Sequence, residues 1–200
     1  MNIYSMIYFA LLIFLFWITG CLNLSSIPGD PRAFKTVDTF SEVSRLAGTE
    51  AKLLSFRVGN VTADGLIDFK RSEHPSWIEY EFIVKATSAD VRAIKADSVK
   101  AGDHIEAKLS VGTIGGAAGL STIERTVRKR RNDKPIDMVY VPEPIVSIAD
   151  ICSKAQKKGL IKSDEKYQIS YEIQGYVVRN NSKFFRLVFS DDGTLLHPSK

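Results

Sequence analysis

The stretch Ile78-Glu79-Tyr80-Glu81-Phe82-Ile83-Val84-Lys85 is the clearest β-strand in this 200-residue sequence. Apolar residues alternate with charged ones, so that one face of the strand can be buried while the other meets solvent. The apolar face of such a strand needs a cover. The remaining sequence therefore has to supply strands of the same kind and an element that packs on them.

Four further segments alternate in the same way. They are Leu54 to Val58, Ile105 to Val111, Tyr167 to Ile173 and Phe185 to Phe189. Ala63-Asp64-Gly65 indicates a turn that would join the first of them to Ile67 and Phe69 as a hairpin, and Asn180-Asn181-Ser182 indicates a second turn. Ser88 to Lys100 is compatible with either helix or strand.

Two short amphipathic helices are predicted to provide the cover. The first begins with the capping-box pattern Thr39-Phe40-Ser41-Glu42 and would end at Gly48. The second begins at Ser147 and would end at Gly159, with an apolar face that includes Cys152.

The order of a helix followed by strand pairs occurs twice, from Thr39 to Ala86 and from Ser147 to Leu196. The two halves share no residue-level identity that would establish a duplication. An antiparallel sheet with helices on one face satisfies both halves, so the predicted fold class is α+β. The sequence leaves open whether the halves form one sheet or two.

This element order, together with the strand-turn endings Val61-Thr62-Ala63-Asp64-Gly65 and Phe189-Ser190-Asp191-Asp192-Gly193, resembles the PepSY-type modules of bacterial envelope proteins. In those modules a helix packs across a small antiparallel sheet. The resemblance implies a non-catalytic module that inhibits or binds another protein.

An apolar, charge-free run from Ile3 to Thr19 leads into Ile18-Thr19-Gly20-Cys21, which resembles the lipobox of bacterial lipoproteins. The resemblance implies that residues 1–20 are a signal peptide and that Cys21 carries the lipid. Leu22 after the cysteine hints at the outer membrane, facing the periplasm, if the envelope is of the Gram-negative type. The alternative is an uncleaved anchor helix, because roughly 17 to 25 apolar residues span a bilayer. Either way, we expect a membrane-tethered protein.

Composition divides the rest of the chain into four parts. We expect a flexible tether at residues 21–36, an α+β half at 37–111, a glycine-rich and basic loop or short helix at 112–134, and a second α+β half at 135–200. The whole chain has a net charge of +4. Its excess lies in the stretch from Val111 to Lys134, which holds 6 basic and 2 acidic residues.

The basic stretch is the strongest functional candidate in the sequence. A glycine-rich loop would lead into a helix capped by Ser121-Thr122-Ile123-Glu124, whose basic residues are Arg125, Arg128, Lys129, Arg130 and Arg131. These side chains could bind anionic lipid, lipopolysaccharide phosphates or an acidic partner protein. The alternative is a solvated loop that only keeps the protein soluble. Nucleic acid is not expected, since no aromatic residues alternate with the basic ones.

Other reactive residues indicate little chemistry. His74, His104 and His197 are too far apart in sequence for a zinc motif, and Cys152 has the position of a small buried thiol. Glu79 and Glu81 would lie about 7 Å apart on one strand face, where a paired-carboxylate site is the alternative to an ordinary solvent face. No metal, cofactor or catalytic activity is expected.

Aromatic residues crowd the C-terminal hairpin, among them Tyr176, Phe184 and Phe185. They predict either core packing or an exposed docking anchor. Taken together, the sequence predicts an envelope lipoprotein that acts as a non-catalytic protein-binding or inhibitory module. The alternative is a structural or assembly factor that contacts membrane phosphates through Arg125 to Arg131.

Overall fold

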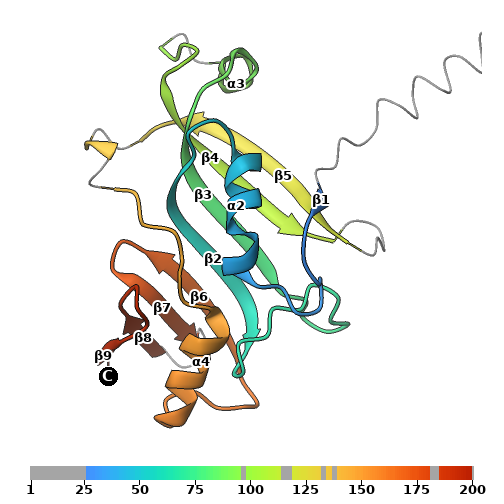
Figure 1. Cartoon of the computed structure of the whole chain (residues 1–200), viewed down its shortest axis with the longest axis vertical. Helices are drawn as coiled ribbons and strands as arrows, with labels where there is room; N and C mark the ends of the chain where they lie inside the picture. Colours follow the sequence, from blue (N-terminus) through green and yellow to red (C-terminus); the bar gives the residue numbers. More distant parts are fainter. Residues whose placement is uncertain are drawn as a thin grey trace, which may run out of the picture.

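The computed structural model describes residues 26–95, 98–113, 119–131, 134–136, 139–180 and 185–199. These residues form an α+β fold that is mostly sheet, with helices packed on an antiparallel sheet (Figure 1). The strands are β1 (Ser26–Ile27), β2 (Lys52–Thr62), β3 (Trp77–Lys85), β4 (His104–Gly112), β5 (Leu120–Lys129), β6 (Lys166–Glu172), β7 (Gly175–Asn180), β8 (Phe185–Phe189) and β9 (Leu195–Ser199). The helices are α2 (Thr36–Ala47), α3 (Ser88–Ile94) and α4 (Ile148–Lys157).

All nine strands belong to one sheet, in the order β1-β5-β4-β3-β2-β6-β7-β8-β9. The N-terminal and C-terminal strands meet where β2 pairs with β6, with Phe56 opposite Tyr171 and Val58 opposite Ile169. The question of one sheet or two, which the sequence leaves open, is therefore settled in favour of one.

A continuous chain of buried rings places α2 and the start of α4 on the same face of this sheet. The chain runs from Phe40 of α2 through Phe82, Tyr80, Phe56 and Tyr171 to Tyr176, with neighbouring ring centroids 4.5 to 6.1 Å apart. The hydroxyl of Tyr176 then donates to the carbonyl oxygen of Val146, just before α4, at 2.6 Å. We call this side the helix face, and the opposite side the open face.

The strand Ile78 to Lys85 has the two-sided character that its alternation predicts. Ile78, Tyr80, Phe82 and Val84 are at most 1% exposed on the helix face, whereas Glu79 and Glu81 lie half-buried on the open face. The start of α4 is also confirmed, because the Ser147 hydroxyl accepts from the backbone N–H of Asp150 at 3.0 Å.

The expected flexible tether at residues 21–36 is wrong for residues 26–36, which pack against the domain. Ser26 and Ile27 pair with β5, and the ring of Phe34 is 3% exposed against Phe69. The predicted capping box at Thr39 is wrong as well. Thr39 lies inside α2 and donates to the carbonyl oxygen of Lys35, which is the N-cap, so the helix begins four residues earlier than predicted.

The expected hairpin between Leu54 to Val58 and the Ile67 and Phe69 segment does not form. β2 continues to Thr62 and pairs with β3, while Ile67 and Phe69 are buried in the connection between the two strands. The ambiguous Ser88 to Lys100 segment contains α3, which a Thr87–Asp90 capping box starts.

The predicted loop or helix at residues 112–134 is wrong for Leu120–Lys129, which form β5. This strand pairs with β4 along most of its length, and its β-branched residues, such as Thr122, Ile123 and Val127, suit a pleated surface. The capping-box pattern at Ser121 does not start a helix, because the backbone N–H and C=O groups of this segment pair with those at the edge of β4 instead. In the part of the chain that the structure describes, no helix is both long and apolar enough to cross a bilayer.

Arg125 of β5 joins three elements on the helix face. Its guanidinium donates to the Asp90 carboxylate of α3 and to the carbonyl oxygen of Ala47 at the end of α2, both at 2.8 Å. The Asp90 side chain is 7% exposed. Burial opposes ionisation of Asp90, but bonds from Arg125 and Thr87 outweigh it and lower its pKa from the ordinary value of 3.8.

Replacing Asp90 with Asn should therefore destabilise the fold at pH 7 by about 2 kcal/mol, the usual scale for a buried bond to a charged group. A folded-state pKa below the unfolded one gives stability that is present above pH 3.8 and lost as pH falls through the folded pKa. The difference in unfolding free energy between the original protein and Asp90→Asn should therefore shrink as pH falls below 3.8. Urea unfolding at several pH values measures it.

Asp38→Asn is the matched control, because Asp38 and its partner Lys35 are 65% and 71% exposed. Its effect should stay below about 1 kcal/mol. An Asp90→Asn difference that is the same at pH 7 and pH 3 would contradict the assigned role of the ion pair.

Candidate functional site

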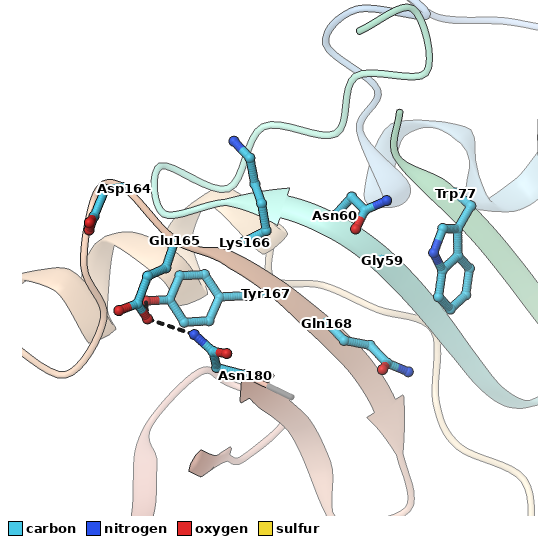
Figure 2. Close-up of a pocket in the computed structure, with 9 residues that line it drawn as sticks. All are labelled: Gly59, Asn60, Trp77, Asp164, Glu165, Lys166, Tyr167, Gln168 and Asn180. Atoms are coloured by element: carbon cyan, nitrogen blue, oxygen red, sulfur yellow. Dashed lines mark hydrogen bonds between the residues drawn. The ribbon is translucent and has the colours of Figure 1, made fainter. Parts of the chain in front are cut away.

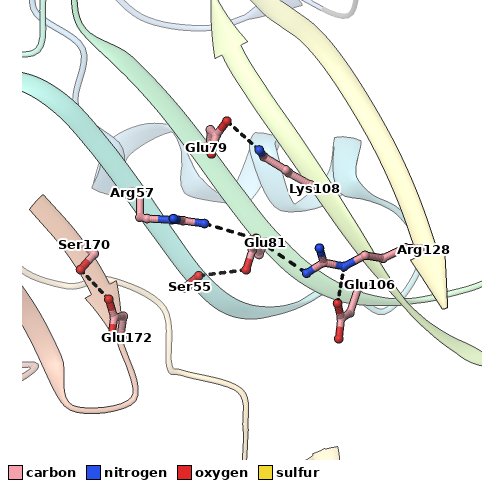
Figure 3. A network of polar contacts seen from close by, with 9 residues as sticks. All are labelled: Ser55, Arg57, Glu79, Glu81, Glu106, Lys108, Arg128, Ser170 and Glu172. Carbon is pink, nitrogen blue, oxygen red and sulfur yellow. Dashed lines mark hydrogen bonds and ion pairs between the residues drawn. The ribbon is translucent and has the colours of Figure 1, made fainter. Parts of the chain in front are cut away.

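The open face carries a lattice of cross-strand ion pairs (Figure 3). Arg57 of β2 lies 3.5 Å and Arg128 of β5 lies 3.9 Å from the carboxylate of Glu81, which stands between them on β3. Arg128 also donates to Glu106 of β4 at 2.6 Å, and Lys108 pairs with Glu79 at 2.7 Å. Arg128 lies directly opposite Glu106 in the register. Arg57 lies opposite Glu79, and Lys108 lies opposite Glu81, so the Arg57–Glu81 and Lys108–Glu79 contacts are diagonal ones between neighbouring strands.

The lattice is electrically balanced, because three basic and three acidic side chains compensate one another within it. Glu79 and Glu81, the candidate carboxylate pair, are each held by cations rather than facing each other. The arrangement therefore gives an ordered polar surface in which each charged side chain of the lattice has a partner of opposite charge.

A cavity of about 460 Å³ opens beside this lattice, where β2 and β3 approach β6 and β7 (Figure 2). We call it the Trp77 pocket. Its lining comprises Gly59, Asn60, Trp77, Asp164, Glu165, Lys166, Tyr167, Gln168 and Asn180. The two aromatic residues Trp77 and Tyr167 thus lie among polar side chains, so the lining is more polar than that of most small-ligand sites.

Trp77 can lie across β2 because its cross-strand partner is Gly59. A Cβ atom added at Gly59 would overlap the indole ring. The Trp77 residue is nevertheless 40% exposed. One side of the indole is therefore supported by the strand beneath it, while part of the ring stays open to solvent.

A β-bulge next to Gly59 shapes the same side of the pocket. The β2–β6 register shifts between Val58 and Val61, and Asn60 there has a φ of 57°. Its carbonyl oxygen accepts from Arg71 and from Ser76, both at 3.1 Å, and its side-chain amide donates to the carbonyl oxygen of Pro75 at 2.9 Å. This backbone conformation is uncommon outside glycine and is held by several bonds, a combination that is frequent at functional sites.

The opposite wall is held together by the carboxylate of Glu165. Its Oε2 atom accepts from the Tyr167 hydroxyl at 3.0 Å and from the Asn180 amide at 2.6 Å. The Tyr167 hydroxyl also accepts from the backbone N–H of Lys162 at 2.7 Å. Burial, and then the neighbouring Glu165, raise the pKa of Tyr167 to about 12, so this phenol stays protonated and keeps donating.

The five basic candidates do not form one patch. Arg125 points to the helix face and binds Asp90 and Ala47, whereas Arg128 lies on the open face and binds Glu81 and Glu106. The ammonium of Lys129 donates to the Ser98 hydroxyl at 3.1 Å. Arg130 donates to the carbonyl oxygen of Lys134, and the backbone N–H of Arg131 donates to Glu106 at 3.1 Å.

The other candidates are dispersed. Cys152 is 0% exposed in α4, and burial raises its thiol pKa to about 12. His74 and His104 are exposed; His74 lies in the connection that leads into β3, whereas His104 lies opposite Lys85 at the other end of β3. The His197 side chain lies outside the described part. No group of three or more metal-binding side chains occurs among the residues that the structure describes. Cys21 and the rest of the lipobox lie outside the described residues.

The aromatic residues of the C-terminal hairpin serve mainly as core. Tyr167, Tyr171 and Tyr176 are at most 2% exposed, and Phe185 is half-buried. Phe184 lies outside the described residues. The exposed aromatic residue near this region is Trp77, which the sequence does not single out. A Gly59-Asn60 pair interrupting an alternating strand is the signal for a bulge that could have drawn attention to it.

Comparisons with known proteins give no match, whether to family models, to curated proteins or to solved structures.

Proposed function

We propose that this chain is a membrane-anchored, non-catalytic binding module of a bacterial cell envelope, and that its open face, centred on the Trp77 pocket, binds the partner. The observation that carries the proposal is the division of the sheet. α2 and the start of α4 pack on the helix face, while the open face presents an ordered ion-pair lattice beside an exposed tryptophan. Such a surface is organised before any partner arrives.

The anchor in this proposal is a lipid on Cys21, after removal of residues 1–20. Its support is the apolar run from Ile3 to Thr19 and the lipobox-like Ile18-Thr19-Gly20-Cys21. Several acyl chains would hold the protein stably, at about 0.8 kcal/mol per buried methylene group.

The proposal includes two similar halves. α2 is followed by β2 to β5, with α3 inserted, and α4 is followed by β6 to β9. The first strands of both halves, β2 and β6, pair antiparallel. The Trp77 pocket lies at this junction, because its lining comes from β2 and β3 on one side and from β6, β7 and the two residues before β6 on the other.

A non-catalytic role agrees with the state of the reactive groups. The Cys152 thiol is buried and its pKa is raised, which is the opposite of an activated nucleophile. Glu79 and Glu81 are both paired with cations.

The alternative is a structural or assembly factor that binds anionic lipid or lipopolysaccharide phosphates through Arg125 to Arg131. It has less support, because Arg125 and Arg128 point to opposite faces and already bind carboxylates. A phosphate would have to compete with those internal partners. An envelope protein remains the partner class that the PepSY-like element order implies.

Lipidation can be tested directly by growing cells with an alkyne-labelled palmitate. The full chain should take up label, and Cys21→Ser should take up none. Cys152→Ser should be labelled as strongly as the original, which makes it the control because the chain has 2 cysteines. Label retained in Cys21→Ser would contradict the proposed anchor.

The reactivity of Cys152 tests the proposed absence of cysteine catalysis. In Cys21→Ser, where Cys152 is the remaining thiol, alkylation by iodoacetamide at pH 8 should be at least about a hundredfold slower in the folded than in the urea-unfolded protein. The reason is that the thiolate is both scarce and inaccessible. Mass spectrometry follows the reaction. Equal rates in both states would argue for an accessible, reactive thiol.

The binding surface is tested by placing a photo-crosslinking amino acid at one of two glutamines. Gln168 lines the Trp77 pocket, whereas Gln156 is exposed on α4. Irradiated cells should yield an adduct of discrete mass from position 168 and not from position 156, and Trp77→Ala should abolish it. Adducts from both positions, or an adduct that survives Trp77→Ala, would place the partner elsewhere.

A further inference from the structure

The indole of Trp77 forms a supported platform. Gly59 beneath it leaves room for the ring and for no side chain, and the residue remains 40% exposed. An exposed tryptophan has a large apolar surface and an N–H group at its edge, so it gains most from a ligand that offers an apolar face and polar edges together. The ring N–H of Trp77 has no hydrogen-bond partner within the described residues.

The lining around this platform is made of amide, carboxylate and ammonium groups. Gln168 lies on β6, across β2 from Trp77, and its side chain makes no hydrogen bond within the described part of the chain (Figure 2). A carboxamide offers two donors and an acceptor that can bind neighbouring hydroxyl groups, each of which both donates and accepts. Asn180 and Glu165 on the far wall are held in place by their own bond.

The charges of the lining disfavour an anion and offset part of its attraction for a cation. Asp164 and Glu165 would repel an anion, whereas Lys166 reduces the pull of these two carboxylates on a cation. The Glu165 oxygen that faces Asn180 already accepts two bonds, which further weakens its attraction for a cation. An uncharged ligand with many hydroxyl groups meets neither obstacle.

We propose that the Trp77 pocket binds an uncharged saccharide, with the C–H face of one pyranose ring on the indole of Trp77 and hydroxyl groups hydrogen-bonded to Gln168 and the neighbouring wall. The volume of about 460 Å³ lies within the usual range for small-ligand sites, roughly 300 to 1,000 Å³. The assignment rests on the proposed function, since the pocket belongs to the proposed binding surface, and it gives the pocket itself to a saccharide in place of a protein partner. The chemistry is shared by N-acetylated sugars, as in cell-wall glycan, and by plain hexoses, as in other polysaccharides.

The test uses the full chain with Trp17→Phe, which leaves Trp77 as the single tryptophan, because the sequence has 2. The protein is kept in a detergent without a sugar headgroup. One arm adds a β-linked N-acetylglucosamine tetramer, and the other adds a β-linked glucose tetramer. Trp77 fluorescence and saturation-transfer NMR of the sugar report binding.

We expect a saturable shift of the Trp77 emission with at least one sugar at millimolar or lower concentration. The affinity for the sugar, measured by saturation transfer, should fall at least about tenfold in Trp77→Ala, because this substitution removes a central aromatic anchor. Trp77→Phe should recover part of the loss, because a smaller ring still stacks. Gln168→Ala should weaken binding several-fold. Ile173→Ala, which removes a 67% exposed apolar side chain from the distant β6–β7 turn, should change nothing.

Binding of the N-acetylated tetramer alone supports the proposal and identifies N-acetylated glycan as the source, whereas binding of both or of the glucose tetramer alone supports it and points to plain hexoses. Binding of neither sugar overturns it, as does sugar binding that survives Trp77→Ala in a variant with an unchanged melting temperature. A Trp77-dependent response to an arginine-rich peptide without sugar binding overturns it in favour of a cationic partner. If no sugar binds but the Trp77-dependent adduct at position 168 persists, the ligand assignment fails and the proposed function stands.

Discussion

The buried rings from Phe40 to Tyr176 are the contact on which the rest of this fold depends. They cross the junction between β2 and β6, where Phe56 touches both Tyr80 and Tyr171. Because aromatic side chains bury much area each, this row couples the N-terminal and C-terminal strands into one core. Hydrogen bonding between β2 and β6 alone would leave two sheets joined at an edge, whereas the shared core makes them one unit.

Because the apolar side chains of the central strands lie mainly on the helix face, the open face of these strands carries mainly charged and polar side chains. Open-face side chains on the central strands must satisfy one another, and alternating charges in register do this through the pairs around Glu81. The exception is the junction itself, where the bulge at Asn60 shifts the register and Gly59 removes a side chain. The pocket thus lies where the cross-strand ion pairs of the open face stop, and the Trp77 ring fills the space above Gly59.

Local patterns were sufficient to predict the α+β class, β3 and the start of α4, because alternation and side-chain capping act within a few residues. They failed at β5, where pairing with β4 outweighs a capping-box pattern at Ser121, and at the start of α2, where Thr39 lies inside the helix and donates to the Lys35 carbonyl oxygen instead of capping it. The pocket could not be predicted, since Trp77 and Gln168 are 91 positions apart in sequence and meet only through the β2–β6 register. The ion pairs of Arg125 and Arg128 could not be predicted either. Their partners, Asp90 and Glu106, come from other elements and are brought close only by the fold.

The pairing of Ser26 with Ser121 has a mechanical consequence. Five residue steps separate Cys21 from Ser26, and an extended chain of that length reaches no more than about 18 Å. A lipid on Cys21 would therefore hold the β5 edge of the sheet close to the bilayer surface. The distance between domain and bilayer would be smaller than the domain itself. The protein could pivot about that edge but could not reach deep into the compartment. Its ligand would have to come to the membrane.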